Sequence, residues 1–321
     1  MKKANFLITS IFFCCFINQS CSQTTSSADG SKKSSFEATT PCTEEIKQML
    51  GVPADYECEM MRWNLSLYRD NKDVPTTFDL SYTYGLGKPG TRGFKEGAKT
   101  IGLKGKWTIK KSKIANIIGD VITLLPANSP ISLSFLQPEE GLLHLLNKDQ
   151  LPLVGTAAWS YTLNNTNRTT SPGGSFVAKE LTSIKIISDN DTVGAFVGRM
   201  PCNESFRRLN NIPATNCQII KCKLILLQDT KTHTPTNFII QTIYVGNGDD
   251  NKYSVTGRWR IMQGRPGDQE AIIYQLVFDA LLPGNEMLLL KAGDDILFFI
   301  NEKSRFLVGN DYSSYTLSRT K

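Results

Sequence analysis

The residues that could bind a metal are few, and their pattern favours packing instead. Cys58, Met60 and Met61 are close together in the sequence and offer soft sulfur ligands of the kind that suit Cu(I). A later segment that repeats this one has Ile219 and Ile220 in place of the two methionines. Exchange with isoleucine indicates an apolar environment. We therefore interpret Met60 and Met61 as core residues and expect no metal or other cofactor.

Residues that could act in catalysis also have simpler interpretations. Asp70 and Asp229 recur at matching positions, but each comes shortly before a Pro-Thr pair that begins a strand, which is typical of a turn. Ser160 and Ser314 recur too, without the Gly-x-Ser-x-Gly surroundings of a nucleophile elbow. Residues 85–90 match the dinucleotide fingerprint in letters, yet a proline and the lack of a following helix pattern indicate a loop. We expect no enzyme.

The repeat itself is the strongest pattern in the chain. The segment from Phe36 to Cys42 returns as Phe196 to Cys202, and each copy ends its opening strand with Pro-Cys. Near the other end, Ser160 to Leu163 returns as Ser314 to Leu317, with the same four residues. Two copies of one module are therefore expected, over residues 34–165 and 192–321, joined by a linker at 166–191.

Each copy is typical of a β-meander. Apolar residues alternate with polar ones in both copies, as at Phe78, Leu80, Tyr82 and Tyr84, and this period of two predicts strands with one buried face. A short helical turn is expected at residues 44–50. About eight short strands in each copy predict an all-β fold of two tandem, lipocalin-like antiparallel barrels, since closing a sheet removes its exposed edges.

The cysteines pair by their places in the repeat. Cys42 and Cys202 hold one repeat position, and Cys58 and Cys217 hold another, which predicts disulfides Cys42–Cys58 and Cys202–Cys217. Metal sites usually space cysteines by two to four residues, far less than here. Cys222 is left as a free thiol in a core position.

The first residues predict export and membrane attachment. Lys2 and Lys3 precede an apolar stretch at 6–17, which is too short to span a bilayer and is typical of a secretory signal over residues 1–20. The stretch ends in Ser-Cys, like a bacterial lipoprotein box, so Cys21 is expected to carry lipid. Residues 21–33, rich in Ser and Thr, predict a flexible tether.

A row of basic residues is the most distinctive exposed feature. Charged residues alternate with Trp107 and Trp259 on the strands that hold these tryptophans, at Lys104, Lys106, Lys110, Arg258 and Arg260. The simplest interpretation is a solvated outer face. The alternative is a surface that contacts anionic lipid headgroups. A net charge of +6, part of it in the signal, is too mild to indicate a nucleic-acid partner.

These motifs together resemble one known family. A β-rich module that opens with an aromatic strand and Pro-Cys, and continues through a Gly-Lys/Arg-Trp strand, resembles the N-terminal domain of the NlpE envelope lipoproteins. The resemblance implies a lipocalin-like barrel, a place in the bacterial envelope, by expectation the outer membrane, and roles in copper tolerance and stress signalling. This chain has widely spaced Cys42 and Cys58 instead of a Cys-x-x-Cys, and a second copy of the module instead of an OB-fold.

The functional expectation is a non-enzymatic binding or stress-sensing module of the bacterial envelope, attached through Cys21. Its partners are then the membrane and an envelope protein. The alternative is a lipocalin-like carrier of a small apolar ligand, since an eight-stranded barrel is just wide enough for one. Copper handling is a third option, by resemblance alone.

Overall fold

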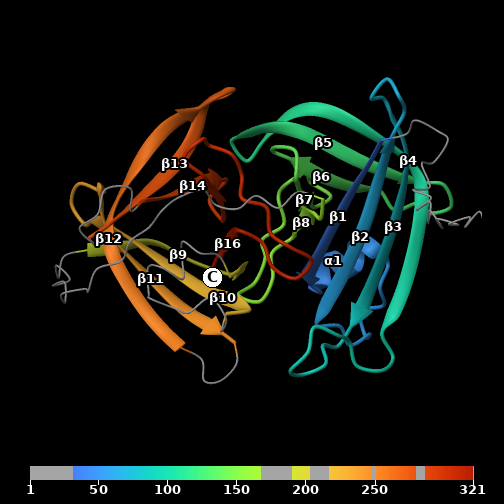
Figure 1. The fold of residues 1–321 in the computed structure, drawn as a ribbon, viewed down its shortest axis with the longest axis horizontal. Helices are drawn as coiled ribbons and strands as arrows, with labels where there is room; N and C mark the ends of the chain where they lie inside the picture. Colours follow the sequence, from blue (N-terminus) through green and yellow to red (C-terminus); the bar gives the residue numbers. More distant parts are fainter. Residues whose placement is uncertain (1–31, 168–189, 203–216, 247–250, 280–285, 321) are drawn as a thin grey trace, which may run out of the picture. The chain divides into compact units, whose positions relative to one another are not determined.

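The chain folds into two closed antiparallel barrels (Figure 1). The structure, a computed structural model, describes residues 32–167, 190–202, 217–246, 251–279 and 286–320. This part of the chain contains the strands β1 to β16 and the short helix α1. The expected pair of eight-stranded barrels is confirmed. No helix among the described residues is both long and apolar enough to cross a bilayer. Cys21 and most of the expected linker lie outside the described residues.

The first barrel is built by neighbours in sequence and closes between its first and last strands. Glu37 of β1 pairs with Asn164 of β8, which completes the ring. Its elements are β1 (Lys32–Pro41), α1 (Glu44–Leu50), β2 (Met60–Arg69), β3 (Pro75–Gly85), β4 (Lys99–Ile114), β5 (Ile117–Pro126), β6 (Leu133–Gln137), β7 (Leu142–Leu146) and β8 (Thr162–Asn165).

The second barrel repeats this order and closes in the same way. Val197 of β9 pairs with Ser318 of β16. Its strands are β9 (Asn190–Pro201), β10 (Ile219–Asp229), β11 (Pro235–Val245), β12 (Asn251–Arg265), β13 (Asp268–Phe278), β14 (Glu286–Ala292), β15 (Ile296–Ile300) and β16 (Thr316–Arg319).

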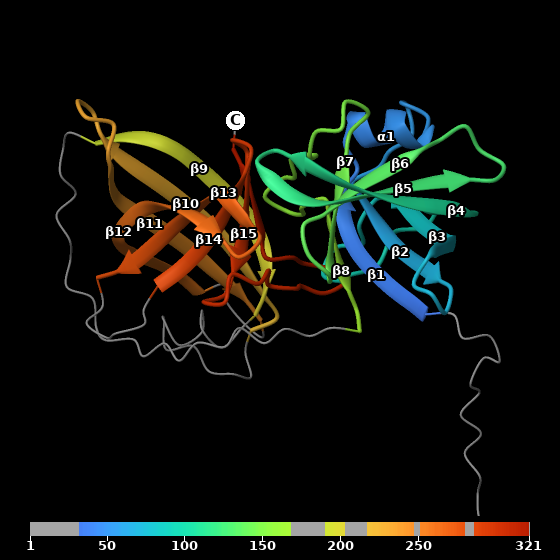
Figure 2. The ribbon, with the colours of Figure 1, turned by 90° about the horizontal axis from the view of Figure 1, so that it is seen from above.

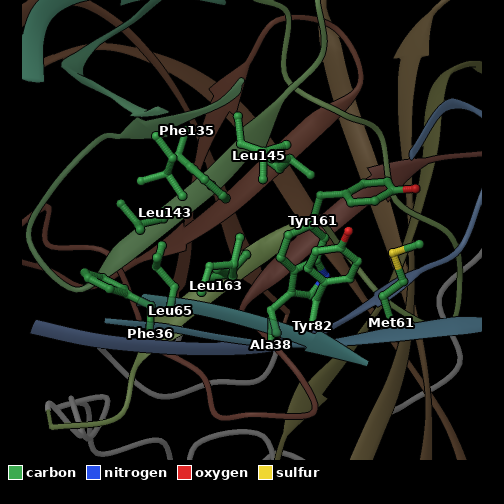
Figure 3. Packing of buried hydrophobic residues seen from close by; sticks show 14 of the residues in the cluster. Phe36, Ala38, Met61, Leu65, Tyr82, Phe135, Leu143, Leu145, Tyr161 and Leu163 are labelled. Atoms are coloured by element: carbon green, nitrogen blue, oxygen red, sulfur yellow. The ribbon is translucent and has the colours of Figure 1, made fainter. Parts of the chain in front are cut away.

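Side chains fill the interior of the first barrel (Figure 3). Trp63 is completely buried, and its indole N–H donates to Thr40 Oγ1 at 2.8 Å. Helix α1 lies at one end of this barrel (Figure 2), with Ile46 and Leu50 in the core. Gly51, in the left-handed conformation with φ of 66°, ends the helix as glycine commonly does. The helical turn expected at residues 44–50 is confirmed.

The glycine before each repeated tryptophan has a steric cause. A Cβ on Gly105 would lie 2.1 Å from the carbonyl oxygen of Leu125 on the neighbouring strand, and one on Gly257 would lie 2.2 Å from that of Val277. Real Cβ atoms do not approach so closely, so the paired strands β4 and β5, like β12 and β13, come together at a point where only glycine fits.

Each barrel carries its own disulfide, as the repeat predicted. Cys42 is bonded to Cys58 with a Cα–Cα separation of 5.6 Å, and Cys202 to Cys217 with 5.8 Å. Every strand, the core cluster and the disulfide of a barrel come from its own part of the chain. Each barrel therefore has a closed sheet and a core of its own.

The two barrels contact each other through a third apolar cluster. It joins the outer sides of β5 to β7 with those of β13 to β15, and its buried members include Leu142 and Leu146 from the first barrel and Ile273 and Phe298 from the second.

The free thiol of Cys222 is buried in the second core, and burial raises its pKa to about 12. We expect residues 32–321, purified without reductant, to show no reaction with a thiol reagent while folded, because the reactive thiolate is scarce. After unfolding in guanidinium, one thiol per chain should react. More than one would contradict the two disulfides, and a fast reaction in the folded protein would contradict the buried position. Cys222→Ala is the control and should show none.

Candidate functional site

The basic residues predicted from the sequence lie on the outer face of the first barrel. Lys104, Lys106 and Lys110 are exposed on β4, while Trp107 points inward and its indole N–H donates to the carbonyl of Tyr68 at 2.9 Å. Lys104 is not a free cation, because its ammonium lies 3.2 Å from the carboxylate of Asp79 across the sheet. The shared face is confirmed, and the neutralised Lys104 is a detail that alternation alone does not reveal.

The second barrel places its arginines at matching positions. Arg258 and Arg260 are exposed on β12 on either side of the buried Trp259. The Nε–H of Arg260 donates to the side-chain oxygen of Gln275 on β13. That bond orients the guanidinium along the outer surface of the sheet.

An exposed aliphatic side chain accompanies a cation at the same place in both barrels. Lys106 pairs across the sheet with Leu125, which is 47% exposed, and Arg258 pairs with Val277, which is 41% exposed. Directly opposed residues in an antiparallel pair point to the same face. The sequence pattern predicted the cations but not their aliphatic neighbours, although Leu125 and Val277 are apolar residues at polar-facing positions of their strands.

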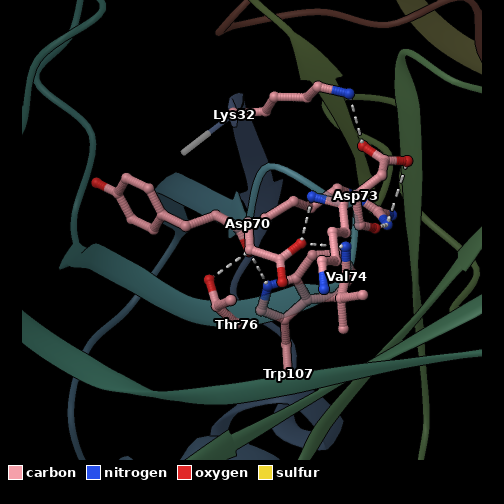
Figure 4. Close-up of polar contacts among 9 residues, drawn as sticks. Lys32, Asp70, Asp73, Val74, Thr76 and Trp107 are labelled. Carbon is pink, nitrogen blue, oxygen red and sulfur yellow. Dashed lines mark hydrogen bonds and ion pairs between the residues drawn. The ribbon is translucent and has the colours of Figure 1, made fainter. Parts of the chain in front are cut away.

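The described chain begins beside this face. Lys32, the first residue of β1, pairs with Asp73 at 3.3 Å in the turn between β2 and β3 (Figure 4). Thr77, just after that turn, is opposite Lys106 in the sheet. Lys32, the first described residue, therefore lies at the end of the barrel that carries Lys106.

The turn at this end is fixed by Asp70 (Figure 4). Its carboxylate accepts hydrogen bonds from the backbone N–H of Lys72 at 2.9 Å and of Val74 at 2.8 Å. Asp229 binds the N–H groups of Lys231 and Thr232 in the second barrel. The predicted turn role of both aspartates is confirmed. Val74 is 52% exposed, which adds a second aliphatic side chain at this end of the first barrel.

Basic side chains outnumber acidic ones at this end of the first barrel, where the described chain begins. Its charged residues are Lys32, Lys33, Arg69, Lys72, Lys104 and Lys106, against Asp70, Asp73 and Asp79. The guanidinium of Arg69 lies 4.7 Å from the centre of the Trp107 ring, so one cation is held flat against the barrel. The end as a whole can attract a negatively charged surface.

The sulfur ligands considered for copper are held apart. The sulfur of Cys58 is bonded to Cys42, and Met61 is fully buried in the first core. Met60 packs beside Trp159 and Tyr312 in a separate cluster. Among the described residues, no three His, Cys, Asp or Glu side chains are grouped as metal ligands. This geometry does not fit a Cu(I) site in the oxidised protein.

A cavity of about 470 Å³ opens at the opposite end of the first barrel, where α1 lies. Its wall includes Tyr56, whose hydroxyl donates to the carbonyl of Gly97 at 2.5 Å and so joins the segment after α1 to the loop between β3 and β4. Leu86 lines the cavity, and Glu57 and Glu96 are among its charged residues. It has the size of a small-molecule site.

His144 is a buried polar group at the contact between the barrels. Its Nε2 lies 2.9 Å from the carbonyl oxygen of Leu153, and its Nδ1 lies 2.9 Å from Thr162 Oγ1. A carbonyl only accepts, so Nε2 carries the proton and Nδ1 accepts from the threonine. Thr162 must then accept from Thr316 of the second barrel, whose Oγ1 is 3.0 Å away. These hydrogen bonds therefore all run in one direction, from Thr316 to Thr162, then to His144, then to the Leu153 carbonyl.

Burial lowers the pKa of His144 to about 4, with the Leu153 carbonyl opposing the shift. Since an unfolded histidine titrates near 6.5, its contribution to stability is complete above that pH and is lost as the pH falls towards 4. We expect the free energy of unfolding of residues 32–321 to drop by about 2 kcal/mol between pH 7 and pH 5 from this group. Urea unfolding at both pH values measures the change.

His144→Phe, which copies Phe298 of the other repeat, is the matched control. It should remove most of the loss between pH 7 and pH 5, although its absolute stability falls because Thr162 and the Leu153 carbonyl lose a partner. An unchanged pH dependence in this variant would contradict the assignment.

Comparison of the chain with family models, with curated proteins and with solved structures finds no match in any of the three. The resemblance to the NlpE family therefore rests on the short repeated motifs of the sequence.

Proposed function

We propose that this protein is a non-enzymatic binding or stress-sensing module, exported to the bacterial envelope and attached to a membrane through acylated Cys21. The signal-like residues 1–20 and the Ser-Cys that follows support export and lipidation. The disulfides Cys42–Cys58 and Cys202–Cys217 suit an oxidising compartment outside the cytoplasm.

The repeated pairing of a cation with an exposed aliphatic residue carries this proposal. Lys106 with Leu125, and Arg258 with Val277, place a positive charge and an apolar group side by side in both barrels. A lipid interface offers anionic headgroups to the first and the acyl boundary to the second. In the first barrel the pair also lies at the end where the chain enters, which is the end nearest to an anchored Cys21 along the chain.

The carrier hypothesis is retained as a second candidate because of one observation, the 470 Å³ cavity at the α1 end of the first barrel. A ligand there would lie at the mouth, because fully buried side chains such as Trp63 and Phe135 occupy the interior. The cavity is lined by Asp55, Glu57 and Glu96 against one cation, Lys99, and this excess of acidic groups favours a ligand with a positive charge beside its apolar part.

Vesicle co-sedimentation of residues 32–321, which lack the anchor, tests the membrane contact. We expect binding to phosphatidylglycerol vesicles at low salt, little binding to phosphatidylcholine, and a steep loss of binding as salt rises, because the attraction is electrostatic. Each cation near an anionic surface contributes about 1 kcal/mol. Changing Lys104, Lys106, Lys110, Arg258 and Arg260 to Gln should therefore weaken binding at least tenfold.

A matched control changes five exposed lysines elsewhere to Gln, namely Lys88, Lys95, Lys148, Lys223 and Lys303. It lowers the net charge by the same amount and should retain most of the binding. Equal losses in both variants would show a general charge effect and contradict a specific surface. Within the first set, we expect Lys106→Gln to matter more than Lys104→Gln, because Asp79 already neutralises Lys104.

Native mass spectrometry separates the two candidate functions. For residues 32–321 purified from an oxidising compartment, we expect the bare mass of the chain. A retained small molecule that is lost from a Tyr56→Ala variant would instead support the carrier and locate its ligand in the cavity, since Tyr56 lines it.

A further inference from the structure

Residues that correspond to each other in the two repeats also touch each other in the structure. Ser160 Oγ lies 2.6 Å from Ser314 Oγ, its counterpart in the second copy. Thr162 Oγ1 lies 3.0 Å from its counterpart Thr316 Oγ1. The ring of His144 is 5.4 Å from that of Phe298, which holds the same repeat position. Contacts of a residue with its own counterpart occur only on a two-fold axis.

Contacts away from this axis occur in reciprocal pairs, as a two-fold axis requires. The backbone N–H of Gly155 donates to Ser318 Oγ at 3.0 Å, and the N–H of Gly309 donates to Asn164 Oδ1 at 2.7 Å. Gly155 corresponds to Gly309, and Asn164 to Ser318, so the second bond is the first one seen from the other barrel. The contact is therefore isologous, with the same patch used on both sides.

The apolar part of the contact has the same symmetry. The buried cluster between the barrels contains corresponding residues from both copies, such as Leu136 with Leu290 and Leu142 with Ile296. Both copies thus retain the same apolar patch on the outside of an already closed barrel. An apolar patch on a closed barrel has no role in the core of that barrel, and a second barrel is what covers it here.

Among the described residues, three ion pairs between the barrels break the symmetry, and one of them joins Arg92 to Asp311 at 3.7 Å. Arg305 pairs with Glu139, whose other carboxylate oxygen accepts from the N–H of Phe306 at 3.1 Å. Lys113 pairs with Glu270. In the repeat alignment Glu139 corresponds to Gly293. A contact between two first barrels, or between two second barrels, would therefore lack the Arg305–Glu139 ion pair. Contacts on the axis therefore suit any two barrels, whereas the ion pairs favour one of each kind.

We infer that this face is a self-complementary docking surface for a barrel of the same kind, and that the first barrel binds the second barrel of another copy of the chain as well as its own. Every contact across the face is non-covalent. Each barrel also closes with its own strands, core and disulfide. Recognition consequently lies in the surface and not in the linker.

The first experiment keeps the full chain. A protease site is inserted within residues 168–189, the folded protein is cut, and gel filtration with native mass spectrometry follows the halves on dilution. We expect the halves to remain together. Glu139→Arg should weaken the complex at least tenfold, because it opposes Arg305 with a like charge. Adding Arg305→Glu should restore part of the affinity, although the bond to Phe306 N–H stays lost. Asp55→Arg, at an exposed position in the segment after α1, is the control.

The second experiment tests self-complementarity in trans. The cut protein, with Ser160→Cys in its first half and Ser314→Cys in its second, is oxidised mildly. We expect cross-linked pairs of first and second barrels, and a slower cross-link between two first barrels through Cys at 160. Ser81→Cys, on an exposed strand position elsewhere, is the control and should not cross-link.

Separation of the halves immediately after cutting would overturn the inference, since the surface would then bind nothing on its own. A first barrel with Ser160→Cys that cross-links to itself no faster than the Ser81→Cys control would overturn self-complementarity. Neither result bears on membrane binding, so the test is independent of the proposed function.

Discussion

Closure of each antiparallel sheet is the constraint on which the rest of this structure depends. β1 joins β8 through only a few paired residues, among them Glu37 and Asn164, yet this short seam removes both edges of the sheet. Once the ring is closed, every second side chain must point into a fixed volume and fill it. Trp63, Phe135 and their neighbours do so in the first barrel. The interior is then used for stability, and contacts with other molecules must be made by the outer face and the ends.

The two copies differ mainly at interior positions where a different combination of side chains can fill the same volume. Trp63 of the first barrel corresponds to Cys222 of the second, a much smaller side chain, and both are buried. Met60 corresponds to Ile219, which packs against the same small cluster. Close packing tolerates exchange among apolar residues when neighbours adjust. Positions set by the backbone do not tolerate it, which is why Gly105 and Gly257 are both glycine. Sequence differences between copies therefore separate packing residues from geometric ones.

Much of each barrel could be predicted because its signals are local. Alternation predicted the buried faces, the place of Asp70 before Pro-Thr predicted its turn, and the repeat positions predicted both disulfides. What could not be predicted depends on strand register or closure. Asp79 faces Lys104, and Leu125 lies beside Lys106, only because of how β3, β4 and β5 align. A pattern of period two shows which side of a strand is buried, but not which residue lies opposite.

The repeated motif near the end of each barrel serves the contact between the barrels as well as the fold. The motif from Ser160 to Leu163 recurs in the second copy, and recurrence alone indicates a shared fold. In the structure, Leu163 and Tyr161 fill the core, while Ser160 and Thr162 point outward and meet their counterparts. Two residues of the motif thus pack the core of the barrel, and the other two form contacts between the barrels. The apolar cluster around this axis supplies attraction without a preferred orientation, since burial of apolar area is non-directional. The hydroxyl contacts add direction, because a buried polar group without its partner is costly. A slip of one barrel past the other would break the Ser160–Ser314 and Thr162–Thr316 hydrogen bonds together, so the polar axis selects one arrangement from the many that an apolar patch alone would allow.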